Sequence, residues 1–285
     1  MKTEILPCYS DTIDLARLTM LVYEYEKSFT LNKDETLETF VSNLKEGKLK
    51  INDTRKEAIF ALAQNAPHGK VVKFISDPKT DLQVGITISE INKRITVVFR
   101  GSESKYDWYY DLSIMKRKLW DDVYVHSGFY NQLHTNGVYE DLVQTIEELM
   151  KENPEYHVYI TGHSLGAALS TLFGYELAHA FNDKKVVIVS FASPRVGNGA
   201  FRKTYDEKEN LVHYRISNDR DIVTAAPMIN FHHIGVNISL TDSLMETFFN
   251  YDYNGWWRYS LFNCWRVSDH DMDLYYTRLL KHKWE

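Results

Sequence analysis

The sequence predicts one α/β domain with a mostly parallel central sheet, helices on both faces and an antiparallel N-terminal edge. Strand-like and helix-like segments alternate between residues 95 and 216, which is typical of a parallel sheet. Ile95–Phe99 is a continuous apolar and β-branched run, as expected for a strand buried on both faces. Two strand-like segments precede it with only short turns between them, which favours antiparallel pairing. The right-handed crossover rule further favours a doubly wound sheet.

The composition is that of an ordinary globular protein of 285 residues, with 44% hydrophobic and 25% charged residues. A formal net charge of −6 and the lack of a basic stripe argue against a nucleic-acid partner. No apolar run approaches the ~20 residues of a transmembrane helix. The first ten residues lack a signal-peptide pattern, so we expect a cytoplasmic location, or secretion if a leader has been removed. No linker-like stretch divides the chain, which favours a single domain over residues 1–285.

The N-terminal part, residues 1–65, is expected to be helical. Apolar residues recur at helical spacing after Ser10, and further helices are predicted at Asp34–Leu44 and Arg55–Ala63. Cys8 and Cys264 are too few for a disulfide framework or a four-thiolate zinc site. We expect two free buried thiols, with a single bridge between them as the alternative.

Strands follow these helices. Val71–Ile75 and Leu82–Ile91 are strand-like, and Asn92-Lys93 forms a hairpin turn before Ile95–Phe99. The remaining predicted elements are a helix at Asn136–Glu152, a strand at Tyr156–Thr161, a helix at Ser164–Phe181, strands at Lys185–Phe191 and Leu211–Ile216, and a helix at Leu274–Leu280.

The most informative segment is Gly162-His163-Ser164-Leu165-Gly166, which fits the pattern Gly-x-Ser-x-Gly. A strand-like segment ends directly before it and a helix-compatible one begins directly after it, which is the context that this sharp turn needs. Side chains at the two glycine positions would clash with the strand and the helix. We therefore predict that Ser164 is a nucleophile.

A serine nucleophile needs a base and an acid that orients the base. In this architecture the acid follows a later strand. Asp219 and Asp221 both lie directly after the predicted strand Leu211–Ile216, and spacing alone barely separates them.

Four histidines lie further along the chain: His232, His233, His270 and His282. His270 is favoured because it lies in a polar loop before a helix, where reacting groups gather, whereas His232 and His233 lie in a strand-like segment. His163 adjoins the serine, but adjacent side chains at a sharp turn point apart, so we expect it to be a packing residue.

A serine nucleophile that attacks a carbonyl group also needs donors for the oxyanion that forms. The backbone N–H of Leu165 follows the nucleophile at a helix N-terminus, and Ser102 at the end of Ile95–Phe99 offers an N–H and a hydroxyl. The histidines show no metal-ligand spacing, and we expect no metal or cofactor.

Several segments together resemble the class 3 (fungal-type) triacylglycerol lipase family, over about residues 71–276. The matching segments are Ile95–Ser102, Asp107–Leu112, Val125–Phe129 (as a strand), Tyr159–Leu169, Phe191–Asn198 and Asp269–Tyr276. This resemblance implies the α/β-hydrolase fold and hydrolysis of lipid esters by a serine.

The resemblance also assigns roles. It implies that Asp221 is the acid and His270 the base, and that His233 is not the base. It implies a lid over residues 103–124 that contains Trp108, and it implies that Asp111 orients the hydroxyl of Ser102.

The expected activity is an acylglycerol lipase acting on a lipid ester at a lipid–water interface, with peripheral membrane contact. The alternatives are a phospholipase A1, a short-chain carboxylesterase or a non-catalytic lipase-like scaffold. Half of the residues in Phe248–Trp265 are aromatic, which fits either an acyl-chain groove or a satellite hydrophobic cluster equally well.

Overall fold

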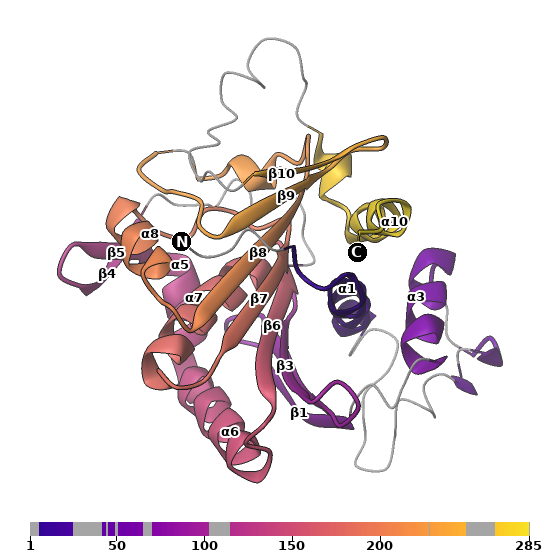
Figure 1. Cartoon of the computed structure of the whole chain (residues 1–285), viewed down its shortest axis with the longest axis horizontal. Helices are drawn as coiled ribbons and strands as arrows, with labels where there is room; N and C mark the ends of the chain where they lie inside the picture. The colour runs from indigo at the N-terminus through magenta and orange to yellow at the C-terminus, as the bar shows by residue number, and fades with distance from the viewer. Residues whose placement is uncertain are drawn as a thin grey trace.

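The central feature of the fold is an eight-stranded sheet in the order β1-β2-β3-β6-β7-β8-β9-β10, with helices on both faces (Figure 1). The computed structural model describes residues 6–24, 42–43, 45–48, 51–64, 70–102, 115–227, 229–248 and 266–284. The predicted α/β class is confirmed. Among the described helices, none combines the length and the apolar character needed to cross a bilayer.

The elements agree with most of the predicted segments. The strands are β1 (Lys70–Asp77), β2 (Leu82–Ser89), β3 (Arg94–Phe99), β4 (Lys116–Trp120), β5 (Val123–His126), β6 (His157–His163), β7 (Val186–Phe191), β8 (Leu211–Asn218), β9 (Val236–Leu240) and β10 (Met245–Phe248). The helices are α1 (Tyr9–Glu24), α3 (Asp53–Gln64), α5 (Ser127–His134), α6 (Val138–Glu152), α7 (Leu165–Ala180), α8 (Gly199–Asp206) and α10 (Met272–Lys281), with 3-10 turns at Val223–Ala225 and Val267–His270.

The middle of the sheet is parallel and both of its edges are antiparallel. Strands β3, β6, β7, β8 and β9 pair in parallel. The predicted N-terminal edge, β1-β2-β3, is antiparallel and is confirmed. The other edge, where β10 pairs antiparallel with β9, was not predicted.

The doubly wound arrangement expected from the sequence is wrong. Strand order in the sheet follows chain order without reversal, and right-handed crossovers between such neighbours all fall on one face. The crossover helices α6, α7 and α8 accordingly share one hydrophobic core, which includes Leu142, Leu169 and Phe201. The opposite face is covered by α1, α3 and α10, which come from the beginning and the end of the described chain (Figure 1).

Strand β3 is buried on both faces, as its apolar run predicts. All six of its residues are buried. Ile95, Val97 and Phe99 face the core with α6 and α7, whereas Val98 faces the core with α1 and α10. This alternation follows from the two-residue repeat of a strand.

Helix α1 lies against the sheet and is buried along most of its length. The guanidinium of Arg94 on β3 is almost fully buried and lies 3.0 Å from Asp11 and 3.6 Å from Asp14 of the helix. A buried charge is tolerated only when it is paired in this way. The ion pairs therefore fix α1 on the central strands.

Some local predictions fail. Helices α5 and α8 were not predicted, and Ser127–Phe129, which was expected to continue a strand, begins α5.

Cys8 is a free thiol but is exposed rather than buried, because it lies just before α1 at the surface. Most of the predicted helix at Asp34–Leu44, and Cys264, lie outside the described residues.

The carboxyl ends of the parallel strands meet at one edge of the sheet. Phe99 at the end of β3 pairs with Gly162, and His163 at the end of β6 pairs with Phe191. Phe191 in turn pairs with Ile216 of β8. The loops that follow these strands therefore lie next to one another, which places the candidate site.

A buried histidine on β8 predicts that the free energy of unfolding depends on pH. His213 lies between the Tyr205 hydroxyl at 2.9 Å from Nδ1 and the Ser190 hydroxyl at 2.8 Å from Nε2. Burial, followed by the charge of Arg215, lowers the pKa of His213 well below 6.5. Below about pH 6.5 the unfolded chain therefore binds a proton on this ring that the folded protein does not.

We expect the free energy of unfolding to fall as the pH drops from 7 to 5, by up to about 1.4 kcal/mol per pH unit from this ring. Urea denaturation of His213→Gln should give a lower free energy of unfolding at pH 7 than wild type. This free energy should also change less between pH 7 and pH 5. His157→Gln, at an exposed position, should keep the wild-type slope. An unchanged slope in His213→Gln would contradict this assignment.

Candidate active site

Ser164 occupies the sharp turn between β6 and α7. Its backbone has φ 60° and ψ −122°, a strained conformation for a residue with a side chain. The turn is held on both sides: the Ser164 N–H donates to the carbonyl of Phe191 at 3.0 Å, and its carbonyl accepts from the N–H of Ala167 at 3.0 Å. This geometry lifts the serine side chain away from both the strand and the helix.

The two glycines of the turn allow strand and helix to approach closely. A Cβ atom on Gly162 would lie 2.4 Å from the carbonyl oxygen of Gly166. A Cβ atom on Gly166 would lie 2.3 Å from the carbonyl oxygen of Phe99 on β3. A side chain at either position would push α7 away from the sheet, so the sequence pattern reflects a packing requirement.

The structure brings together the three side chains predicted to form a triad. His270 Nε2 lies 2.7 Å from the Ser164 hydroxyl oxygen. His270 Nδ1 lies 2.9 Å and 3.0 Å from the two carboxylate oxygens of Asp221. A carboxylate only accepts, so Nδ1 carries the proton, and Nε2 of the neutral ring is then free to accept from the serine. Relative exposures of 5% for Ser164, 4% for His270 and 0% for Asp221 place this chain of bonds out of bulk water.

Asp221 is held by two further donors. The Tyr275 hydroxyl donates to Asp221 Oδ2 at 2.7 Å, and the Val223 N–H donates to Oδ1 at 2.9 Å. Burial, followed by the charge of Asp221, raises the pKa of Tyr275 well above 10, so the phenol keeps its proton. The same hydroxyl accepts from the N–H of Asn218 at 2.9 Å. Both carboxylate oxygens of Asp221 are therefore held against the ring of His270.

The role of Tyr275 was not predicted from the sequence. The available signal was its place in the segment Asp269–Tyr276, on which part of the family resemblance rests. Its spacing of five residues from His270 places it on the first turns of α10, facing the loop after β8. The Arg266 N–H donates to the carbonyl of Arg220 at 3.0 Å, which joins the loop that contains His270 to the loop that contains Asp221.

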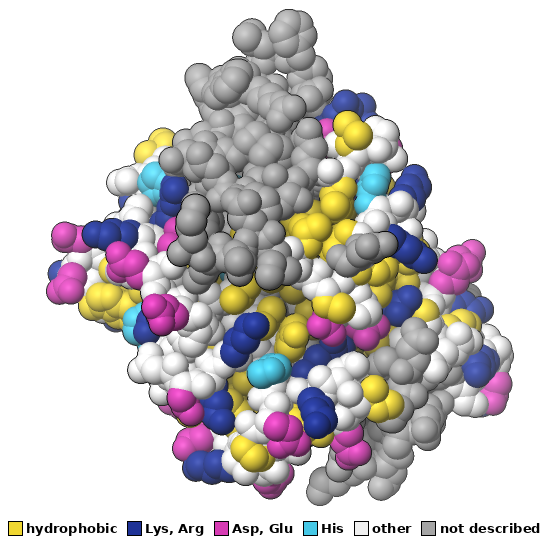
Figure 2. Space-filling view, in the orientation of Figure 1, with side chains coloured by type: hydrophobic (Ala, Val, Ile, Leu, Met, Phe, Trp, Pro, Cys, Tyr) yellow, Lys and Arg dark blue, Asp and Glu magenta, His cyan; other side chains and the backbone are white. Residues whose placement is uncertain are grey.

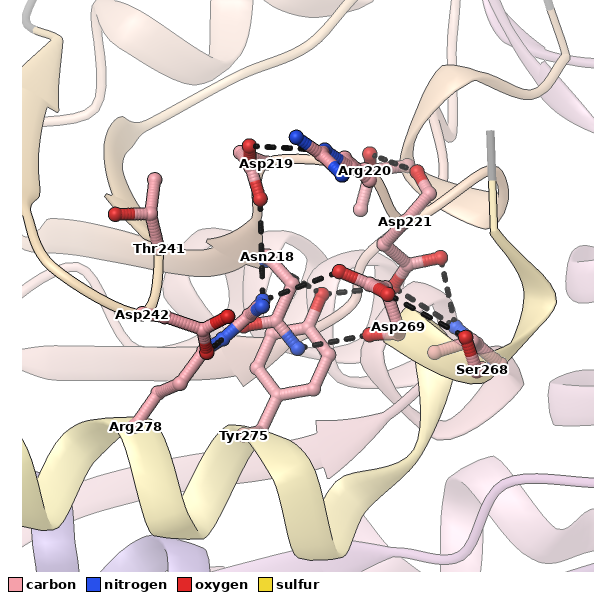
Figure 3. Close-up of polar contacts among 12 residues, drawn as sticks. Asn218, Asp219, Arg220, Asp221, Thr241, Asp242, Ser268, Asp269, Tyr275 and Arg278 are labelled. Carbon is pink, nitrogen blue, oxygen red and sulfur yellow. Dashed lines mark hydrogen bonds and ion pairs between the residues drawn. The ribbon is translucent and has the colours of Figure 1, made fainter. Parts of the chain in front are cut away.

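A second polar network, centred on the buried side chain of Arg278, lies beside the triad (Figure 3). Its guanidinium is 3.1 Å from Asp242 and 3.3 Å from Asp269, and it is 3.9 Å from Asp219. The side-chain amide of Asn218 donates to the carbonyl of Asp269 at 2.7 Å. Asp269, which precedes His270, is thus held through both its side chain and its main chain.

This network separates the two candidate aspartates. Asp219 faces Arg278 and Arg220, and burial raises its pKa while these two cations oppose the rise. Asp221, not Asp219, lies against His270. Sequence spacing could not distinguish Asp219 from Asp221, because both lie in the loop after β8. The path of that loop determines which carboxylate points toward His270.

The other histidines considered from the sequence have different partners. His233 is buried, and burial followed by the charge of Arg215 lowers its pKa well below 6.5. His282 Nε2 donates to the carbonyl of Thr241 at 2.9 Å, and the His232 N–H donates to the carbonyl of Gly197. His163 packs its ring 4.6 Å from that of His270 and bonds to the main chain, in line with the packing role predicted for it.

The candidate oxyanion donors lie next to the serine turn. Leu165 is the first residue of α7, and Ser102 is the third residue after β3. The close approach of Gly166 to the backbone of Phe99 and Arg100 brings these two segments together. Asp111 and Trp108 lie outside the described residues, as does most of the predicted lid.

The last part of the predicted lid, from Lys116 onward, is the hairpin of β4 and β5. Trp120 of this hairpin stacks on Tyr175 of α7, with ring centroids 5.6 Å apart. Of the aromatic segment Phe248–Trp265, residues 249–265 lie outside the described residues. Within the part of the chain that the structure describes, no group of three or more His, Cys, Asp or Glu side chains could hold a metal ion.

The family model described as Lipase (class 3) matches residues 96–231, which run from β3 to the loop after β8. Just under half of the chain therefore matches the class 3 lipase family. The matched region contains Ser164 and Asp221, whereas His270 and helix α1 lie outside it. The predicted family resemblance is thereby confirmed.

Curated relatives are lipases and phospholipases. A lipase of Rhizomucor miehei is 31% identical over 185 residues, which cover 62% of this chain and 50% of that protein. A secreted mono- and diacylglycerol lipase A of Penicillium cyclopium is 29% identical, over 55% and 51%. A chloroplastic phospholipase A(1) of Arabidopsis thaliana is 32% identical, over 56% and 40%. The chain thus spans about half the length of the curated relatives it matches.

The class 3 lipase fold extends over nearly the whole chain. The solved triacylglyceride lipase of Rhizomucor miehei superposes with a TM-score of 0.73 at 22% identity, over 93% of this chain and 96% of that one. The α/β-hydrolase fold implied by the sequence resemblance is therefore confirmed.

Proposed function

We propose that this chain hydrolyses carboxylic esters of lipids, acylglycerols above all, with Ser164 as nucleophile, His270 as base and Asp221 as the acid that orients the base. The observation that carries this proposal is the unbroken set of hydrogen bonds from the serine hydroxyl through the imidazole to the carboxylate. A serine hydroxyl is a weak nucleophile near neutral pH and needs such a base.

The reaction would proceed in two displacement steps. Ser164 Oγ attacks the ester carbonyl while its proton passes to His270 Nε2, which lies 2.7 Å away. The alcohol leaves with that proton, and an acyl group stays on the serine. Water then attacks the acyl group, again through His270. Asp221 stabilises the imidazolium that forms in each step.

The negative oxygen of each intermediate would be stabilised by the N–H of Leu165 and by Ser102. The position of Leu165 at the start of a sixteen-residue helix supports this, because helix N-termini favour negative charge. The support given by Asp111 to Ser102, and the lid with Trp108, stay predictions.

A lipid substrate is proposed from two observations. Two of the curated relatives are named for acylglycerols or for phospholipids. Large apolar side chains are also exposed in loops next to the site: Ile229 in the loop that contains Asp221, Leu244 after β9, and Val267 three residues before His270. These side chains would meet a lipid surface that carries the ester, with peripheral contact only.

Phospholipase A1 activity is the second candidate, favoured by the Arabidopsis thaliana relative. We also propose that residues 1–285 act as one domain, because α1 and α10 share a core on the second face of the sheet. The cytoplasmic location stays a prediction, and the name of the Penicillium cyclopium relative favours secretion instead.

The test is hydrolysis of p-nitrophenyl esters from acetyl to palmitoyl, below and above their aggregation thresholds, by wild type and by Ser164→Ala. We expect cleavage of the long chains, a rise in rate above the threshold, and loss of at least about 1000-fold in the variant. Dioleoylphosphatidylcholine and trioleoylglycerol, assayed in parallel, separate the two candidates.

Cleavage of short esters alone would instead indicate a short-chain carboxylesterase. If wild type hydrolyses none of these esters, the chain is a non-catalytic scaffold and the proposal is overturned. The same holds if Ser164→Ala keeps wild-type rates.

A further inference from the structure

A tyrosine from the N-terminal helix reaches the main chain of His270 through one intermediate ring. Tyr23 lies near the end of α1, and its hydroxyl is 2.8 Å from His163 Nδ1. His163 Nε2 is 2.8 Å from the carbonyl oxygen of His270. The three residues are buried, so each of these bonds is made out of bulk water.

The direction of each bond follows from its partners. A carbonyl oxygen only accepts, so Nε2 of His163 must carry a proton and donate it. In the neutral imidazole Nδ1 is then an acceptor, and the Tyr23 hydroxyl must be the donor. Burial raises the pKa of Tyr23 far above its ordinary value, which keeps the phenol protonated for this task. The phenol thus fixes the tautomer in which His163 can hold the His270 carbonyl.

The same hydroxyl also meets the segment that leads to Ser102. The Gly101 backbone amide hydrogen-bonds to it, and a Cβ atom on Gly101 would lie only 2.0 Å from the phenol oxygen. A Cβ there would also lie 2.5 Å from the His163 carbonyl. The phenol therefore fills the space between the end of β3 and the serine turn.

Tyr23 is itself held in place from two other helices. Arg55 of α3 stacks on its ring, with the guanidinium carbon 5.6 Å from the centroid. Arg55 also pairs with Glu24 of α1 and lies 2.9 Å from Asp273 of α10. These contacts leave the phenol little freedom to turn away from His163.

We propose that Tyr23 is a positioning residue that sets the tautomer of His163 and thereby fixes both the main chain of the base, His270, and the oxyanion segment at Gly101. This inference rests on the proposed hydrolytic function. It means that α1, which lies outside the matched family region, contributes to the active site as well as to the core. Its removal should change turnover more than substrate affinity, because the phenol touches neither the substrate nor the serine.

The test is Tyr23→Phe, with Tyr205→Phe as a matched control. Tyr205 is also a buried tyrosine, and its hydroxyl lies 2.9 Å from Nδ1 of another buried histidine, His213, away from the site. We expect kcat of Tyr23→Phe to fall between about 10-fold and 100-fold, with KM within about 2-fold of wild type. Tyr205→Phe should lose stability by a similar amount and keep its kcat. Equal kcat in the two variants would overturn the inference.

A second variant tests whether the effect passes through His163. The amide of Gln can donate to the His270 carbonyl without a tautomer that needs setting. In a His163→Gln background, Tyr23→Phe should therefore lower kcat clearly less than in the wild-type background. The same loss in both backgrounds would contradict the route through His163.

The tautomer can be measured without any activity, which separates this inference from the proposed function. Long-range proton–nitrogen NMR spectra of 15N-histidine-labelled protein distinguish the two tautomers, and His163→Gln identifies the His163 signals by their loss. We expect a single Nε2–H form in wild type at pH 7.5. A Nδ1–H or doubly protonated ring would overturn the inference, even in a chain that hydrolyses no ester.

Discussion

Asp221→Asn is expected to lower kcat about 10,000-fold while the fold is retained. The reason lies in the donors that surround this carboxylate. Oδ1 accepts from the Val223 N–H, Oδ2 accepts from the Tyr275 hydroxyl, and both oxygens face His270 Nδ1. An asparagine retains only one accepting oxygen and introduces an N–H₂ group.

If that oxygen keeps its bond to the Val223 N–H, the new amide donors face Tyr275 and His270. The imidazole then places its proton on Nε2, toward Ser164, and can no longer accept the serine proton. The matched control is Asp219→Asn, two residues away, whose carboxylate faces Arg278 instead. Its kcat should stay within about 3-fold of wild type. The measurement is kcat of both variants, with circular dichroism to check that each is folded. Equal losses of kcat in the two variants would contradict the assignment of Asp221 as the acid.

Gly166→Ala is expected to have the largest effect on stability. Its Cβ would meet backbone atoms, the Phe99 carbonyl oxygen at 2.3 Å and the Arg100 carbonyl carbon at 2.9 Å, which cannot move aside as a flexible side chain would. Helix α7 would have to shift away from β3 and carry the serine turn with it. We expect a loss of about 3 kcal/mol in the free energy of unfolding, together with loss of most activity.

Gly85→Ala on β2 is the matched control for this glycine. The nearest atom to its added Cβ is Phe74 Cδ2 at 3.7 Å, an ordinary contact distance. Its free energy of unfolding, from urea denaturation, should stay within about 1 kcal/mol of wild type, because the Cβ has room and the unfolded chain loses entropy. A Gly166→Ala protein as stable as the Gly85→Ala protein would show that the close approach of helix and strand is not needed.

The parts of the fold that the sequence predicts well are those set by local chemistry. The apolar run of β3 and the glycines around Ser164 each have one physical explanation, and the structure agrees with both. Helix α5 could not be found in this way, because its N-cap is the ring of His126, which accepts from the Gly128 N–H, and not one of the usual capping residues. Helix α8 did carry a signal, Asn198 as N-cap, but is only eight residues long.

The parts that the sequence does not predict depend on contacts between distant segments. Asp219 and Asp221 share a loop, and their spacing alone left both open as the acid. The family resemblance favoured Asp221, and the position of Arg278 on α10 gives the physical reason why Asp219 turns away. Tyr23 has no local feature that sets it apart, since its partner His163 lies 140 residues away. The sequence also did not predict that α1 and α10 cover the second face of the sheet. Neither helix connects two parallel strands, so the crossover rule does not place them.

The central claim is that Ser164 carries the acyl group during ester hydrolysis. The most direct test treats the protein with a p-nitrophenyl alkylphosphonate, measures the intact mass and locates the label by peptide mapping. The account predicts one phosphonyl group per chain, on Ser164, with loss of hydrolysis in proportion to labelling, and no label on Ser164→Ala. Ester hydrolysis that persists after complete labelling, or a label on any other residue, would contradict it.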